Sequence, residues 1–190
     1  MVDEWDQRLA FLLEVDKLKL VERQSRVTGG GRRENSAEHS WHLALFALLL
    51  GKGRSVDLLK AVKMLIIHDL VEIDAGDTPL HSSDRQDKVE AEKAAADRLY
   101  GLLPVNDSVE YRALWDEFEE GSSAEAVFAR GMDRLQPLLL NILNNGGTWR
   151  ENGVSEQTVI ERYKPFISAA MPDVWPTVEQ MVRNHFAQSR

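Results

Sequence analysis

The chain of 190 residues contains no cysteine, which excludes disulfides and thiolate ligands for a metal. Any bound metal must therefore be held by histidine, aspartate or glutamate. Basic residues are in the minority, since 23 lysines and arginines stand against 31 acids and the formal net charge is -8. No long stretch is strongly basic, which argues against a protein that binds the backbone of a nucleic acid polymer.

Long hydrophobic runs are also missing. The longest apolar run near the middle, LALFALLL at residues 43–50, is far shorter than the ~20 residues that cross a bilayer. The N-terminal segment carries acids through its apolar stretch and does not have the pattern of a signal peptide. We therefore expect a soluble, cytoplasmic protein that has no membrane partner.

Helical periodicity dominates the chain, and no segment shows sustained alternation of apolar and polar residues. The length suits one core, so we expect an all-α fold in which residues 1–190 form a single domain. The expected helices are a first one with Leu9, Leu12, Leu13 and Leu20 on one face, then 35–51, 55–75, 83–100, 107–120, one that opens at residue 122, 155–170 and 173–187. Residues 21–34, with three glycines and four arginines, are expected to form a loop.

Capping residues mark several of the expected helix starts. Asn35 with Glu38, and Ser122 with Glu125, fit the capping-box pattern. Ser55 is expected to cap the helix whose buried face carries Leu58, Leu59, Val62, Leu65 and Ile66, and Ser83 the helix after it. Pro137 falls inside an expected helix, where it should either bend the helix or end it.

Four polar residues lie in otherwise apolar helical stretches: His39, His68, Asp69 and Asp133. Each one alone is more often a hydrogen-bonded core histidine or a salt-bridged aspartate than a metal ligand. Together, two imidazoles and two carboxylates make a suitable ligand set for one divalent first-row metal. Such an ion keeps positions open for water and substrate, and its charge would compensate the burial of the ligands.

Two further acids follow the His68-Asp69 pair. Glu72 comes four residues after His68 and three after Asp69, so on a continuing helix it would share their face. Asp77 comes after the Ala75-Gly76 break, where the chain could turn it back toward the same site. These acids favour a catalytic metal site over a purely structural one.

Three segments together resemble the HD-domain metal-dependent phosphohydrolases: ENSAEHSWHLAL (34–45), IHDLVEIDAGD (67–77) and ARGMDRLQPLLLNI (129–142). Within that superfamily the sequence is more similar to the bacterial 5'-deoxynucleotidase group and its relatives. The resemblance implies that His39, His68, Asp69 and Asp133 bind the metal.

The same resemblance implies roles for residues outside the ligand set. Glu72 would orient or deprotonate the attacking water, and Asp77 would assist beside the substrate. Arg23 would hold the phosphate, as a planar guanidinium can grip two of its oxygens. Gln24 stands where the bacterial deoxynucleotidase has a tryptophan that crowds the sugar, so both selectivity for deoxyribose and tolerance of a ribose hydroxyl stay open.

The expected function is therefore release of phosphate from (deoxy)ribonucleoside 5'-monophosphates by a homodimer with one divalent metal ion. Mn, Co, Fe or Ni suits the ligands, and Zn is a further option. Two alternatives stay open: a phosphodiesterase or pyrophosphohydrolase acting on another small nucleotide, and a metal-binding interaction module without turnover.

Overall fold

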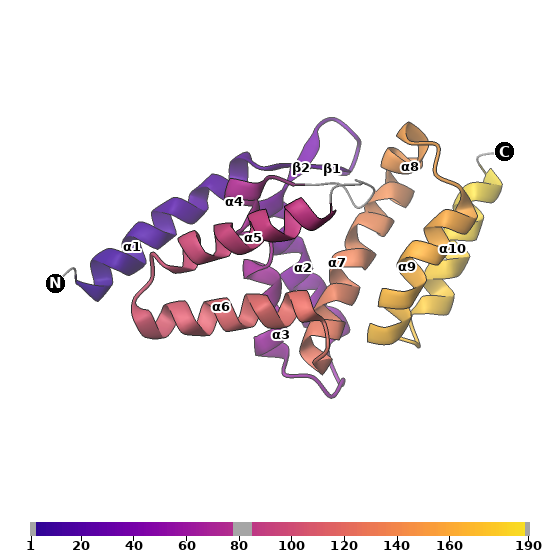
Figure 1. The fold of residues 1–190 in the computed structure, drawn as a ribbon. Coiled ribbons are helices and arrows are strands. Elements are labelled where there is room, and N and C mark those ends of the chain that lie inside the picture. The colour runs from indigo at the N-terminus through magenta and orange to yellow at the C-terminus, as the bar shows by residue number, and fades with distance from the viewer. Residues whose placement is uncertain (1–2, 78–84, 189–190) are drawn as a thin grey trace.

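The computed structural model describes residues 3–77 and 85–188, and most of this part of the chain is helical (Figure 1). The N-terminal half contains α1 (Glu4–Val15), the 3-10 helix η1 (Asp16–Leu20), α2 (Ser36–Leu50), α3 (Leu58–Ile67) and α4 (Glu72–Ala75). The remainder contains α5 (Arg85–Tyr100), α6 (Val105–Glu120), α7 (Ala124–Leu143), α8 (Gly147–Glu151), α9 (Glu156–Ala170) and α10 (Trp175–Gln188). The predicted all-α fold is confirmed.

The segment predicted as a loop contains a small antiparallel hairpin, so that prediction was incomplete. Strand β1 (Glu22–Arg26) pairs with β2 (Arg33–Asn35), with Glu22 opposite Asn35 and an irregular register between the two ends. Its five- and three-residue strands are too short for alternation to stand out from the sequence. The hairpin contacts α7 and α8 and brings Arg23 toward the centre of the molecule.

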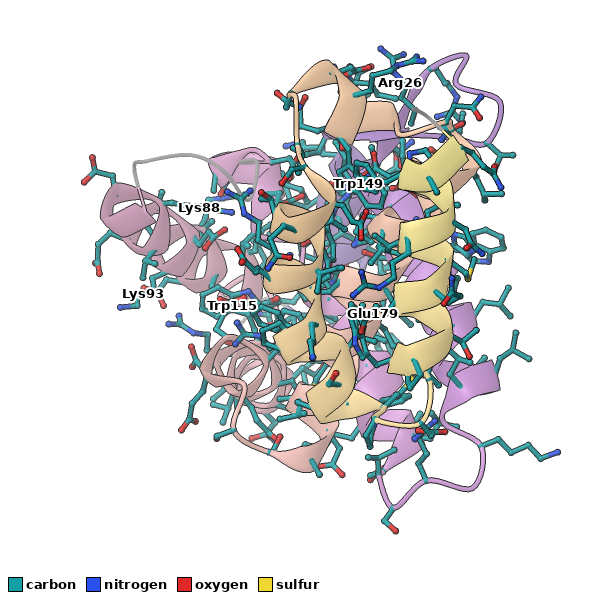
Figure 2. The ribbon with its side chains drawn as sticks, turned by 90° about the vertical axis from the view of Figure 1, so that its right-hand side faces the viewer. Arg26, Lys88, Lys93, Trp115, Trp149 and Glu179 are labelled. Carbon is teal, nitrogen blue, oxygen red and sulfur yellow. The ribbon has the colours of Figure 1, made fainter. Side chains whose placement is uncertain are left out.

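Helix α7 forms the centre of the core. It packs against α2, α3 and α6 on one side and α9 on the other (Figure 1). The close approach to α9 depends on Gly131, where an added Cβ would lie 2.3 Å from the Ala170 Cβ. Figure 2 looks onto α9 and α10 and shows Trp149 between them, where its ring stacks on Phe186 with centroids 5.8 Å apart.

The predicted leucine face of the first helix is not buried. Leu9, Leu12, Leu13 and Leu20 are 57–81% exposed, whereas Phe11 and Leu18 point into the core. Helix α1 ends at Val15, and η1 follows it directly and carries Leu18 and Leu20. The four leucines therefore form an outer surface, because only a narrow side of α1 faces the rest of the protein.

The predicted helix 55–75 is divided in two. Helix α3 is capped by Asp57 rather than Ser55 and ends at Ile67, and α4 begins only at Glu72. The buried side chains of α3 are Ala61, Met64, Leu65 and Ile67. The predicted buried face was therefore correct at Leu65 but wrong at Leu59 and Ile66, which are exposed. The break places His68 and Asp69 in the turn between the two helices.

The other helix starts agree with the sequence more closely. Asn35 and Glu38 form the predicted capping box, while Ser123 rather than Ser122 caps α7. Helix α7 continues through Pro137 without ending, and Ser83 lies outside the described residues. Within the described ranges, no helix is long and apolar enough to cross a membrane.

Candidate metal centre

The structure brings together the four residues proposed as metal ligands. His39 comes from α2, His68 and Asp69 from the end of α3, and Asp133 from α7. His39 Nε2 lies 3.1 Å from Asp133 Oδ1 and 3.9 Å from Asp69 Oδ2. His68 Nε2 lies 3.0 Å from Asp69 Oδ1 and 3.7 Å from Asp133 Oδ1. All four side chains are buried, so two imidazoles and two carboxylates converge on one small volume.

The spacing of these atoms fits a shared cation. Donors about 2.1 Å from a single metal ion lie roughly 3.0–3.4 Å from one another, and the observed separations of 3.0–3.9 Å fall at or slightly above that range. In addition, the buried His68 Nε2 has no hydrogen-bond partner among the described residues. A metal would give this buried nitrogen a partner once its proton has left.

Both imidazoles direct Nε2 toward the shared volume because Nδ1 is engaged elsewhere. His68 Nδ1 lies 2.9 Å from the carbonyl oxygen of Leu65, which can only accept a hydrogen bond. His39 Nδ1 lies 3.0 Å from Gln136 Oε1. Partners of this kind fix the orientation and the tautomer of a metal-binding histidine.

The electrostatics of the cluster favour a positive charge. Complete burial, with Arg23 nearby, lowers the pKa of His39 to about 4, so its imidazole is neutral and available as a ligand near pH 7. Burial also acts to lower the pKa of His68, but Asp69 and Asp133 outweigh it and raise that pKa to about 9. A proton on His68 thus supplies the charge that a cation would otherwise provide.

Two arginines hold the outer oxygens of the carboxylates. Arg23 Nη1 lies 2.6 Å from Asp69 Oδ2, and Arg134 Nη1 lies 3.3 Å from Asp133 Oδ2. Asp133 thus has one oxygen that faces the histidines and one that is paired with a guanidinium, whereas Asp69 Oδ2 pairs with Arg23 and also lies 3.9 Å from His39 Nε2. Such pairing limits the rotation of both carboxylates.

The two acids proposed as catalytic lie beside this cluster. Burial, with a further contribution from Asp69, raises the pKa of Glu72 to about 8, although Arg23 and a 2.7 Å hydrogen bond from Ser36 Oγ oppose the shift. Burial likewise raises the pKa of Asp77, which is half-buried and interacts electrostatically with Arg23 and Asp69. Glu72 can therefore exchange a proton near neutral pH.

Sequence reasoning missed three buried polar residues around the cluster: Glu34, Ser36 and Gln136. All three belong to the segments that carry the family resemblance, at positions other than those of the proposed ligands. Gln136 comes three residues after Asp133 on α7, a spacing that places both on one side of a helix. That spacing was the only local signal for it.

The sequence is similar to those of known proteins. The family model of the HD domain matches residues 15–175. The curated 5'-deoxynucleotidase HDDC2 of Homo sapiens is 31% identical, over 69% of this chain and 65% of its own length. The Xenopus laevis protein of the same name is 30% identical, over 69% of this chain and 66% of its own. The matched part is thus just under two thirds of the length of these relatives.

Solved structures agree in fold. A predicted metal-dependent phosphohydrolase from Magnetospirillum magnetotacticum is 42% identical, with a TM-score of 0.93 over 98% of this chain and 94% of that one. The PH0347 protein from Pyrococcus horikoshii is 27% identical, with a TM-score of 0.66 over 91% and 99%. Because the family model covers most of the sequence, as do both folds, this chain belongs to the HD domain family.

Proposed function

We propose that this protein is a metal-dependent 5'-nucleotidase that releases phosphate from (deoxy)ribonucleoside 5'-monophosphates. The observation that carries the proposal is the convergence of His39, His68, Asp69 and Asp133, with the proton-exchanging carboxyl of Glu72 beside them. The relatives named 5'-deoxynucleotidase support the substrate class.

The proposed metal site would hold one divalent ion, with Mn, Co, Fe or Ni as the preferred choices and Zn as a further one. When bound, the ion would supply Lewis-acid activation of water and of a phosphoryl oxygen. Glu72 is the proposed base that takes a proton from the attacking water. Asp77, whose pKa burial raises, is the proposed donor of a proton to the departing 5' oxygen. Water and phosphomonoester thus become nucleoside and inorganic phosphate.

Arg23 is the proposed phosphate-binding residue. Its Nη1 pairs with Asp69, whereas its buried Nε has no hydrogen-bond partner in the described part of the chain. A guanidinium offers five donors, so contact with Asp69 leaves capacity for a phosphate oxygen. Gln24 follows it directly, and its backbone hydrogen bonds to the Asp77 carboxyl. This contact supports a sugar pocket next to the proposed acid.

The decisive experiment is a matrix of divalent metals against nucleotides, with matched ribo- and deoxyribonucleoside monophosphates, dinucleotides, cyclic nucleotides and nucleoside triphosphates. We expect phosphate release from monophosphates only when metal is added. Exclusive cleavage of a diester or a pyrophosphate would replace the proposal with the phosphodiesterase or pyrophosphohydrolase alternative. Metal-loaded protein inert on every nucleotide would favour an interaction module without turnover.

Variants of the proposed site sharpen the test. Glu72→Gln should keep the metal content and lose turnover, whereas His68→Ala should lose both. Glu120→Gln, an exposed acid at the end of α6, is the matched control and should change neither. Undiminished turnover of Glu72→Gln would contradict the role given to Glu72.

We also propose that the protein is a homodimer joined through α2. From Leu43 to its end at Leu50 this helix consists only of apolar residues, a pattern typical of a helix buried on all sides. The outer side of α2 is nevertheless exposed, and so is the outer side of the adjacent α3. In Figure 2 the purple segment that contains both helices lies on the right-hand side, away from α9. The exposed apolar residues here are Trp41, Leu45, Leu48, Leu49, Leu59 and Ile66.

The size of this apolar surface suits a second copy of the chain. The six side chains are 41–69% exposed, which corresponds to roughly 700 Å², close to the ~800 Å² that each partner buries in a stable complex. Light scattering after size exclusion should give twice the 21.5 kDa mass of one chain. Leu48→Glu should give a monomer, and Leu143→Glu, an equally exposed leucine at the end of α7, should not. A monomeric wild-type protein would refute this proposal.

A further inference from the structure

Glu34 and Gln136 are buried polar residues for which the proposed reaction has no direct use. Glu34 lies on β2 immediately before α2, and Gln136 lies on α7. Gln136 is completely buried and Glu34 is 4% exposed. A buried carboxylate and a buried amide destabilise the fold unless their hydrogen bonds are made, so the partners of these two side chains indicate their purpose.

The two side chains form a continuous series of contacts that ends at His39. Gln136 Nε2 donates to Glu34 Oε1 over 2.7 Å, and it lies 3.3 Å from His42 Nδ1. On its other side, Gln136 Oε1 lies 3.0 Å from His39 Nδ1. Arg23 approaches the far end of this series, with its Nε 3.9 Å from Glu34 Oε2.

The direction of each hydrogen bond follows from chemistry. An ionised carboxylate can only accept, so Glu34 requires the amide nitrogen of Gln136 to face it. The amide oxygen must then face His39, and this oxygen can only accept from Nδ1–H. A neutral imidazole with its proton on Nδ1 keeps the Nε2 lone pair free. With Gln136 reversed, the proton would lie on Nε2 and point at the proposed metal.

We propose that Glu34 and Gln136 are positioning residues that fix the ring orientation and tautomer of His39 for metal binding. The inference rests on the proposed metal site. Helix α7 thereby contributes twice, because Asp133 is a proposed ligand and Gln136, one turn later, orients another. His68 differs, since its Nδ1 meets the backbone carbonyl of Leu65 and no side-chain substitution can remove that acceptor.

Exchanging the two side chains tests the donor-to-acceptor order of the hydrogen bonds that connect Glu34, Gln136 and His39. Glu34→Gln removes the carboxylate that orients the amide, and Gln136→Glu places two carboxylates in contact. The double variant restores one donor and one acceptor, because the new amide at position 34 can donate to the new carboxylate at position 136, which accepts from His39. We expect each single variant to bind metal 10–100-fold more weakly and the double variant to recover most of that loss.

The readout is the dissociation constant for Co²⁺ and Mn²⁺, measured by competition with a chelating indicator at about pH 8. Burial raises the pKa of Glu34 to about 7, so this carboxyl is ionised at the pH of the measurement. Asn141→Ala is the control for fold damage. It removes another buried polar residue of α7, which bonds to Pro137 O and Thr148 N. This variant should lower the melting temperature and leave metal affinity unchanged.

Two results would overturn the inference: single variants that bind metal as tightly as the wild type, or a double variant as weak as the weaker single one. Both concern binding rather than turnover. A protein that shows the expected affinities but hydrolyses no nucleotide would overturn the proposed function and leave the role of Glu34 and Gln136 intact. A wild-type protein that binds neither cation would overturn both.

Discussion

The hydrogen bond between Ser36 and Glu72 offers a direct test of the proposed base. Ser36 Oγ donates to Glu72 Oε2 over 2.7 Å, and both side chains are buried. The bond stabilises the ionised form of Glu72 and so holds its pKa below the value that burial alone would give. Removing the hydroxyl in Ser36→Ala should therefore raise the pKa of Glu72 further. At any pH below the new pKa, a smaller fraction of Glu72 should then be ionised than in the wild type.

The size of the effect follows from the strength of the bond. A hydrogen bond to a charged group contributes roughly 1.5–3 kcal/mol, and one pKa unit corresponds to about 1.36 kcal/mol. Because Glu72 is buried, little of this is lost to screening by water. The acidic limb of the pH–rate profile should move up by about one to two pH units, and the rate at the alkaline plateau should be largely preserved.

The assay is phosphate release across pH at saturating metal and substrate. Ser40→Ala is the matched control, because Ser40 is a buried serine of the same helix whose Oγ has no hydrogen-bond partner within the described residues. Its profile should overlay that of the wild type. If Ser36→Ala also overlays the wild type while Glu72→Gln is inactive, the hydrogen bond does not set the charge of Glu72 and the argument fails.

Three further predictions concern the metal, the core and the sugar. Metal at a free concentration about 100 times its dissociation constant should stabilise the fold by about 2.7 kcal/mol; Asp133→Ala should abolish the resulting rise in melting temperature, and a rise that persists would exclude Asp133 as a ligand. Gly131→Ala should cost about 1–3 kcal/mol in urea unfolding, because its Cβ would overlap that of Ala170; an unchanged midpoint would contradict the close packing of α7 on α9. Gln24→Trp should raise the ratio of kcat/KM for deoxyribo- over ribonucleoside monophosphates, and a constant ratio would show that this side chain does not contact the sugar.

The sequence predicted the proposed ligands better than it predicted the helices that carry them. His39, His68 and Asp133 stood out because ionisable groups in apolar helical stretches are costly without a partner. Their neighbours in space, Glu34 and Gln136, did not stand out, since a glutamate before a cap and a glutamine near a proline are ordinary on a surface. Only the approach of β2 to α7 makes them part of the cluster.

Which apolar helix faces are buried was harder to predict. Helical periodicity identifies a row of apolar residues on one side of a helix but not the part of the protein that packs against it. The leucines of α1 form such a row and lie outside, while the second half of α2, residues 43–50, has no polar residue and still leaves Leu49 exposed. Which side of a helix is covered depends on tertiary contacts that periodicity does not specify. That residues 1–190 form one domain stays a prediction.

The helix break at His68 shows why the residues of the proposed site could be identified from the sequence but their geometry could not. The sequence predicted one continuous helix over residues 55–75, yet α3 ends at Ile67 and His68 becomes its C-cap. The His68 Nδ1 meets the carbonyl oxygen of Leu65, one of the last-turn carbonyls that a helix end leaves without a backbone partner. The same ring that satisfies the end of α3 therefore turns its Nε2 toward Asp69 and Asp133. The C-cap contact of α3 and the proposed metal coordination therefore use different ring nitrogens of one imidazole.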